Sequence, residues 1–154
     1  MIDLKTKPVN LKNLKVAVLG AKRSGIAAAI LAARRGAEVL LSDAANPEIA
    51  PQQRLELKQH NVQLEIGGHT SKIFDSDLVV LSPGIPNDAP IVIEVTKHSI
   101  PIVAEVEMAY WLCPTDNIIA VTGSNGKTTT TTLLSEIFRH SIRTVLWRQH
   151  RDGF

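Results

Sequence analysis

The first hundred residues alternate between short apolar runs and longer segments of helix-forming residues. Short runs rich in Val, Ile and Leu that stop at Gly, Ser or Pro are typical of the fully buried strands of a parallel sheet. The pattern predicts five strands, at residues 14–19, 38–41, 62–66, 77–81 and 100–104. It predicts helices between and after them, at residues 24–35, 47–59, 89–98 and 105–112. Such an alternation predicts an α/β fold with a doubly wound, parallel, five-stranded sheet.

Signals at the ends of these elements predict how the chain is organised. Ser24 stands where a hydroxyl can cap the first helix, and Gly36 stands where a helix ends in a left-handed residue. The sequence Cys-Pro-Thr-Asp at 113–116 is typical of a linker, and an apolar strand at 117–121 and a helix at 127–140 are predicted to follow it. We therefore expect one domain over residues 1–113 and the beginning of a second over residues 114–154.

Composition narrows the class of protein. Hydrophobic residues make up 44% of the chain and charged residues 21%, which is typical of folded globular proteins. The net charge is only +2 and aromatics are 4%, so neither a basic stripe nor a stacking platform for nucleic acid is indicated. No apolar run is long enough to span a membrane, no export signal is visible, and the single Cys113 is interpreted as a structural thiol. We expect a cytoplasmic monomer that binds neither nucleic acid nor membrane.

Three histidines occur singly on polar segments and do not suggest a metal site. His60, His69 and His98 lack a second histidine at helical spacing, and surface positions are favoured for all three.

The predicted strand at 117–121 runs directly into Thr122-Gly123-Ser124-Asn125-Gly126-Lys127-Thr128-Thr129. Glycines allow backbone N–H groups to converge on an anion, and the following helix directs its positive end at phosphates. Lys127 is predicted to reach the β- and γ-phosphate oxygens of ATP, and the Thr128 hydroxyl to bind Mg²⁺. An ordinary turn is the alternative. Val121 stands where the longer phosphate-loop pattern has its first glycine, which disfavours the usual NTPase families.

A second loop with phosphate-binding character follows the first predicted strand. It runs from Gly20 to Gly25 and has Lys22 where dinucleotide-binding loops have their middle glycine, which argues against NAD or FAD. Arg23, Ser24 and the first backbone amides of the helix can receive a diphosphate, and Asp43 can accept hydrogen bonds from ribose or base. The alternative is a tight turn in which Asp43 only caps backbone groups.

A third loop, Ser82-Pro83-Gly84-Ile85, ends the strand predicted at 77–81, at the edge where open α/β sheets bind ligands. Together, these three loops resemble those of the Mur ligases, a family with a Rossmann-like first domain and a P-loop-type ATP-binding central domain. The resemblance covers roughly residues 12 to 140 and is strongest to the members that add D-glutamate. These ligases use ATP and Mg²⁺ to activate a carboxylate as an acyl phosphate, which an amino acid then attacks.

Carried over position by position, the resemblance implies two sets of contacts. Residues Gly123 to Thr129 would hold the ATP phosphates, with Lys127 and Thr128 acting in catalysis and Thr128 bearing Mg²⁺. Arg23, Ser24, Asp43 and Gly84 would hold the UDP part of UDP-N-acetylmuramoyl-L-alanine, with D-glutamate as the second substrate. Arg23 replaces an apolar residue that is common in the family, so its role rests on charge alone.

Other functions stay open at this point. A Mur ligase for another step, such as the L-alanine-adding enzyme, shares the ATP loop but differs in its amino-acid substrate. A non-catalytic nucleotide-binding module is the alternative outside enzymes, and an NAD-dependent oxidoreductase is disfavoured by Lys22.

The last residues depart from the family pattern, which has Gly-Asn-Ile-Gly in this region. Trp147 is encoded only by TGG, and with suitable synonymous codons residues 147–154 can be written TGG CGG CAA CAT CGG GAT GGG TTT, which one base later reads Gly-Gly-Asn-Ile-Gly-Met-Gly. We therefore hypothesise a shifted reading frame before Trp147. The family's central domain is also longer than residues 114–154, so we expect an unstable tail and no ligase activity from this chain alone.

Overall fold

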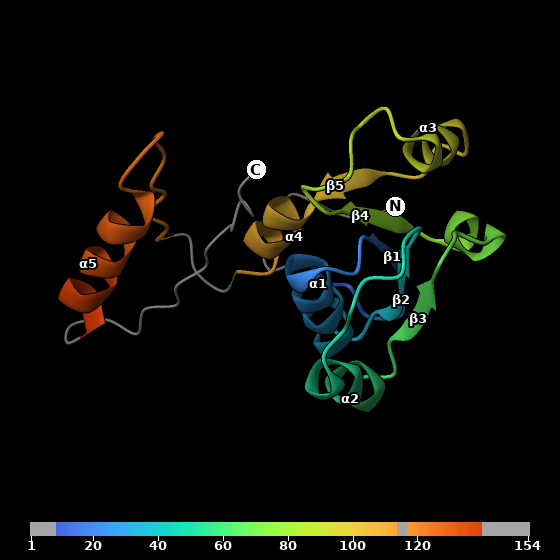
Figure 1. Ribbon diagram of the computed structural model, residues 1–154, viewed down its shortest axis with the longest axis horizontal. Helices are drawn as coiled ribbons and strands as arrows, with labels where there is room; N and C mark the ends of the chain where they lie inside the picture. The colour runs from blue at the N-terminus through green and yellow to red at the C-terminus, as the bar shows by residue number, and fades with distance from the viewer. Residues whose placement is uncertain (1–8, 114–116, 140–154) are drawn as a thin grey trace. The chain divides into compact units, whose positions relative to one another are not determined.

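The computed structural model of the chain describes residues 9–113 and 117–139, and the hypothesis about residues 147–154 lies outside them. Five strands form one parallel sheet in the order β3-β2-β1-β4-β5 (Figure 1). The strands are β1 (Lys15–Leu19), β2 (Glu38–Asp43), β3 (Gln63–Ile66), β4 (Leu78–Leu81) and β5 (Ile102–Ala104). The helices are α1 (Arg23–Arg34), α2 (Pro51–Gln59), α3 (Pro90–Lys97), α4 (Glu105–Trp111) and α5 (Lys127–Arg139), with a 3₁₀ helix η1 at Ser71–Asp75. The predicted α/β fold and five-stranded parallel sheet are confirmed.

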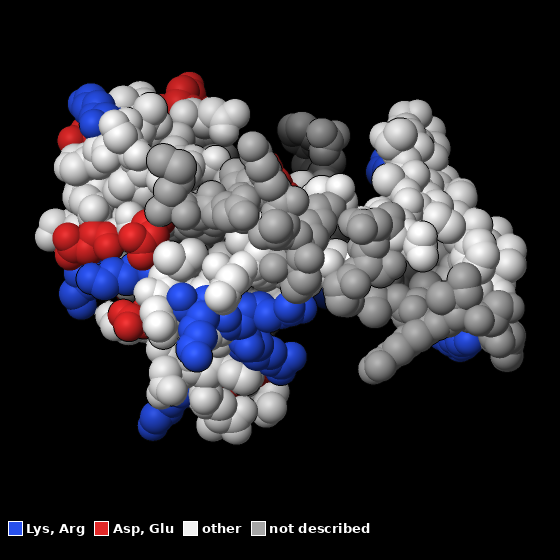
Figure 2. Space-filling view, turned by 180° about the vertical axis from the view of Figure 1, so that it is seen from behind, with Lys and Arg blue, Asp and Glu red and all other residues white. Residues whose placement is uncertain are grey.

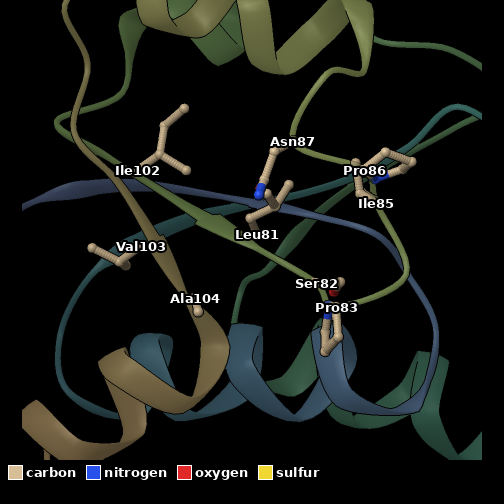
Figure 3. Close-up of a pocket in the computed structure, with 9 residues that line it drawn as sticks. All are labelled: Leu81, Ser82, Pro83, Ile85, Pro86, Asn87, Ile102, Val103 and Ala104. Atoms are coloured by element: carbon tan, nitrogen blue, oxygen red, sulfur yellow. The ribbon is translucent and has the colours of Figure 1, made fainter. Parts of the chain in front are cut away.

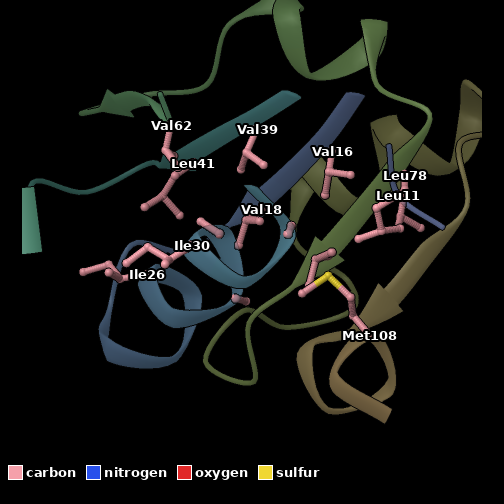
Figure 4. Close-up of a cluster of buried hydrophobic side chains, with 14 of the residues drawn as sticks. Leu11, Val16, Val18, Ile26, Ile30, Val39, Leu41, Val62, Leu78 and Met108 are labelled. Atoms are coloured by element: carbon pink, nitrogen blue, oxygen red, sulfur yellow. The ribbon is translucent and has the colours of Figure 1, made fainter. Parts of the chain in front are cut away.

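Both faces of the sheet are buried, which explains why its strands read as continuous apolar runs. Side chains such as Val16, Val18 and Leu41 pack on one face with residues of α1, α2 and α4 (Figure 4). The alternate residues of the same strands, among them Ala17 and Leu19, pack on the other face with η1 and α3. Successive side chains of each strand therefore point into two different cores, one on each face of the sheet, and not alternately into a core and into solvent.

The strand order reverses beside β1, and this reversal positions the site. β2 and β3 lie on one side of β1, and β4 and β5 lie on the other. The loops that leave the carboxyl ends of β1 and β4 therefore depart on opposite sides of a crevice, which is where open α/β sheets bind ligands.

The start of α1 differs from the prediction. Ser24 is not the N-cap: Lys22 holds that position in extended conformation, and Ser24 is the second residue of the helix. The helix begins earlier because the N–H of Ile26 already bonds to the Lys22 carbonyl oxygen at 2.9 Å. No side chain among the described residues caps this helix start. The predicted end of the helix is confirmed by Gly36, whose φ is +85°.

The second difference concerns residues 117–121, for which a strand was predicted. These residues form no strand, and none of the five described strands pairs with them. An apolar segment becomes a strand only beside a neighbour that accepts and donates its backbone hydrogen bonds, so the pattern alone does not suffice. The helix predicted next is confirmed as α5, whose described part ends at Arg139.

The chain divides into two compact units, Met1–Pro114 and Thr115–Phe154. Among the described residues, no helix combines the length and the hydropathy that crossing a membrane requires. The space-filling view in Figure 2 shows one group of Lys and Arg side chains on the first unit and acidic side chains beside basic ones elsewhere. One exposed pair on this unit joins Arg34 and Glu56 at 3.1 Å, and pairs of this kind contribute about 0–1 kcal/mol.

Candidate functional site

The first loop is shaped by close packing of its two glycines. Gly20 has a φ of +100°, a conformation that favours glycine. A Cβ atom on Gly25 would lie 1.8 Å from the carbonyl oxygen of Gly20, and a Cβ on Gly20 would lie 2.8 Å from the Cβ of Ser82. Both glycines of the predicted motif are therefore required by contacts within the protein, where the third loop packs on the first.

Asp43 ties three loops together at the end of β2. Its Oδ2 accepts a hydrogen bond from the N–H of Ala21 at 2.7 Å, and its Oδ1 accepts one from the N–H of Ala45 at 2.9 Å. Its carbonyl oxygen accepts from the N–H groups of Gly67 and Gly68 at 3.0 and 3.3 Å. The capping role considered from the sequence is thus present, and a further contact with ribose or base stays a prediction.

The start of α1 offers cationic and backbone donors beside Asp43. Lys22, Arg23 and Ser24 are exposed at this helix start, and no described side chain caps its backbone amides. The first amides of a helix carry a partial positive charge and lack partners inside the helix, so they can donate to an anion. The structure brings Arg23, Ser24 and Asp43 to the same loop region, because Asp43 bonds to Ala21 next to the helix start.

The third loop is anchored by a buried carboxylate that sequence reasoning did not identify. Ser82 is buried, and its hydroxyl donates to Oε1 of Glu105, which is only 4% exposed at the start of α4. The Ser82 hydroxyl oxygen also lies 3.4 Å from the carbonyl oxygen of Gly20. Glu105 stands 23 residues beyond Ser82 and belongs to no motif, so only its position directly after a strand hinted at a site.

Gly84 lies in the open part of the third loop, beside a groove at the ends of β4 and β5. A Cβ on Gly84 would meet no atom within 4 Å. The adjoining groove has a volume of about 480 Å³ (Figure 3). It is lined by Leu81, Ser82, Pro83, Ile85, Pro86, Asn87, Ile102, Val103 and Ala104. The polar groups labelled in Figure 3 come mainly from Ser82 and Asn87, so this groove suits an uncharged part of a ligand.

A cluster of polar side chains surrounds the ends of β2 and β3. Ser42 is fully buried, and its hydroxyl donates to Oε2 of Glu65 at 2.7 Å. The Ser42 hydroxyl oxygen also lies 2.8 Å from Nδ1 of His69. The hydroxyl and N–H of Thr70 also donate to Glu65, at 2.5 and 3.1 Å. Burial by itself would raise the pKa of Glu65, but these hydrogen bonds from Ser42 and Thr70, helped by nearby His69, hold the pKa below its ordinary value.

The histidines differ in their surroundings. His69 is half-buried in this cluster and is not the plain surface histidine that its sequence context favoured. His60 accepts from Arg34 at 3.2 Å, and His98 stacks on Phe74 with ring centres 4.3 Å apart. Within residues 9–113 and 117–139, no group of three or more His, Cys, Asp or Glu could hold a metal ion.

The loop before α5 contains two glycines with positive φ angles, and its predicted role in binding phosphate stays a prediction. Gly123 and Gly126 have φ angles of +148° and +76°, which favour glycine. The Lys127 ammonium group folds over this loop and donates to the carbonyl oxygens of Gly123 and Ser124, the latter at 3.3 Å. The side chains of Thr128 and Thr129 are exposed at the start of a 13-residue helix.

Comparison with known proteins decides the family. Residues 15–91 match the family described as the MurD N-terminal domain, and residues 121–152 match the Mur ligase middle domain. The chain belongs to the Mur ligase family. It is 42% identical over 128 residues to the UDP-N-acetylmuramoylalanine--D-glutamate ligase of Chloroherpeton thalassium, covering 83% of this chain and 27% of that enzyme. It is 44% identical over 131 residues to the enzyme of the same name from Chlorobaculum tepidum, covering 85% and 28%.

Solved structures of Mur ligases have the same fold. The murein peptide ligase of Psychrobacter arcticus superposes with a TM-score of 0.62 at 26% identity, covering 84% of this chain and 27% of that one. The UDP-N-acetylmuramate-alanine ligase of Thermotoga maritima gives a TM-score of 0.54 at 23% identity, covering 83% and 30%. The chain thus spans just over a quarter of the length of the curated Mur ligases that it matches.

Proposed function

We propose that this chain carries the UDP-substrate-binding domain of a D-glutamate-adding Mur ligase over residues 1–113. The proposal rests on the hydrogen bond from the Ala21 N–H to the Asp43 carboxylate, since this bond fixes the loop after β1 beside the uncapped start of α1. Backbone amides and Arg23 and Ser24 at this start would receive the diphosphate, with Gly84 on the opposite wall of the crevice. The names of the similar enzymes support UDP-N-acetylmuramoyl-L-alanine as the ligand.

Residues 114–154 are proposed to begin the central ATP-binding domain. Two glycines with positive φ just before the start of a long helix support this proposal, because converging backbone amides at such a position can bind phosphates. Residues Gly123 to Thr129 fit ATP by this geometry, and the exposed Thr128 hydroxyl fits Mg²⁺ because hard cations prefer oxygen ligands. When bound, ATP with Mg²⁺ would supply the phosphoryl group that activates the substrate carboxylate for attack by D-glutamate.

The roles of this chain's own residues follow from charge and position. Lys127 bonds to the loop carbonyls through an exposed ammonium group that can instead turn to phosphate oxygens. A positive group near a transferring phosphoryl group stabilises the charge that develops on its oxygens. The first unit would bind and orient the sugar nucleotide.

We also propose that the reaction takes place in the cytoplasm and that the protein is monomeric.

Calorimetric titration tests the binding of the sugar nucleotide, and an assay for ADP tests the ligase activity. We expect saturable binding of UDP-N-acetylmuramoyl-L-alanine to the chain, and no formation of ADP when ATP, Mg²⁺ and D-glutamate are added. ADP formation together with the D-glutamate adduct would contradict the expected inactivity of the chain alone. The absence of binding by the sugar nucleotide, or equal binding by NAD, would contradict the proposed function of the first unit.

A further inference from the structure

The cluster of Ser42, Glu65 and His69 fixes the proton on one ring nitrogen of His69. Ser42 has one hydroxyl proton, and an ionised carboxylate can only accept hydrogen bonds. The proton therefore points to Glu65 Oε2, at 2.7 Å, and the Ser42 oxygen is left to accept. Since Nδ1 of His69 lies 2.8 Å from that oxygen, Nδ1 is the nitrogen that carries the proton and donates.

The other ring nitrogen, Nε2, is consequently an acceptor in the neutral imidazole. No hydrogen bond joins Nε2 to another group in the described part of the chain. Within that part, every side-chain nitrogen or oxygen that is fully buried has a partner, so Nε2 must be reached by solvent. The chain therefore holds a rigidly oriented acceptor at the protein surface.

This acceptor stands at the carboxyl edge of the sheet, next to the residue that clamps the proposed nucleotide loop. His69 follows the two glycines whose N–H groups bond to the Asp43 carbonyl oxygen, and its partner Ser42 directly precedes Asp43. The carboxylate oxygens of Asp43 and Glu65 already accept bonds from the protein. Of these three side chains, His69 is the one with an acceptor atom that no described group uses.

We propose that His69 contacts the nucleobase of the ligand. Its Nε2 would accept a hydrogen bond from an imide N–H of the base, such as the one that uracil carries at N3. This rests on the proposed function, because it assigns a base-contacting residue to the same UDP site. Ser42 and Glu65 are positioning residues, since they act on the ligand only through the orientation and tautomer of His69. Because water can reach Nε2 when no ligand is bound, the loss of this contact should cost only one net hydrogen bond.

The test compares UDP with 3-methyl-UDP, in which the ring N–H is replaced, on the wild-type chain and on His69→Ala. Wild type should bind UDP roughly threefold to tenfold more tightly than 3-methyl-UDP, the range of one net hydrogen bond, and His69→Ala should bind the two equally. If His69→Ala keeps the full preference, another group reads the base and the inference fails while the UDP site stands. If wild type binds neither compound, the proposed function itself fails and this inference with it.

A measurement on the wild-type chain keeps the test independent of any variant's folding. The ¹⁵N resonances of the His69 imidazole should show that its neutral form carries the ring proton on Nδ1 and not on Nε2. On addition of UDP, the Nε2 resonance should move in the direction of a hydrogen-bonded acceptor, and 3-methyl-UDP should leave it in place. Finding the single proton of the neutral ring on Nε2, with Nδ1 unprotonated, would overturn the assignment, whatever the ligand does.

Discussion

The Asp43 carboxylate accepts the backbone N–H of Ala21 at 2.7 Å, and this bond joins the ends of two neighbouring strands. Ala21 is buried, with 1% of its surface exposed, so its N–H cannot turn to water if the carboxylate is removed. We expect Asp43→Ala to lower the free energy of unfolding by about 1–3 kcal/mol, the cost of an unsatisfied buried donor. The same change should weaken UDP binding at least tenfold, which calorimetry measures.

The chain provides a matched control at the opposite end of the sheet. Asp77 Oδ2 accepts the N–H of Lys15, the first residue of β1, at 2.8 Å, so this is again a bond from a backbone N–H to a carboxylate. Asp77→Ala removes the same kind of bond far from the carboxyl edge, so UDP affinity should stay at the wild-type value. Equal losses of UDP affinity in the two variants would show that Asp43 acts only through general stability.

The same substitution to alanine should affect stability at one glycine of the carboxyl edge and ligand binding at another. Gly25→Ala places a methyl group against the Gly20 carbonyl, so we expect a destabilisation of roughly 1–3 kcal/mol in denaturant unfolding. Gly84→Ala meets no protein atom and should change stability by less than about 0.5 kcal/mol. Because Gly84 is proposed to contact the ligand, this second variant should instead weaken UDP binding several-fold. Unchanged UDP affinity in Gly84→Ala would remove Gly84 from the site.

Glu65 should make stability depend on pH. Its pKa is lowered in the folded chain, so its contribution is present above the unfolded-state pKa and is lost as the pH falls through the folded-state pKa. Stability should therefore drop below about pH 4.3, the ordinary pKa of glutamate, and the drop should be smaller in Glu65→Gln. NMR titration of the Glu65 carboxyl carbon should show its pKa rising in Ser42→Ala. An unchanged pKa in that variant would mean that the Ser42 hydrogen bond does not stabilise the charged form.

Lys127 should dominate the affinity for ATP in the second unit. Amide resonances of residues 123–129 should shift on addition of ATP and Mg²⁺, and Lys127→Ala should strongly reduce these shifts. Lys97→Ala is the control, since Lys97 is an exposed lysine that pairs with Glu94 on α3. Full-sized shifts in Lys127→Ala would show that the backbone cradle binds phosphate without the ammonium group.

The elements of the first unit could be predicted because their signals are local. Strands such as β1 and β4 are apolar on both faces, and Gly36 marks the end of α1. The strand predicted at 117–121 is wrong, because strand formation depends on a pairing neighbour and not on the apolar segment alone. Ser24 was misassigned as a cap because the start of the helix is decided by the turn at Gly20 and not by the identity of one hydroxyl residue.

The loops of the candidate site were predictable, and the side chains that hold them were not. Asp43 was identified because it ends a strand next to a glycine-containing loop. Glu105 lies 23 residues from its partner Ser82. Glu65 and His69 lie 23 and 27 residues from Ser42, and contacts over such separations give no recognisable spacing in the sequence. Their partners become evident only when the fold brings the ends of non-adjacent segments together.

The most direct test of the proposed UDP site is a crystal structure of the chain soaked with UDP. The diphosphate should lie against the first backbone amides of α1, beside Arg23 and Ser24, with the uracil ring toward His69. Density for UDP at another surface, with the start of α1 unoccupied, would contradict the proposed site.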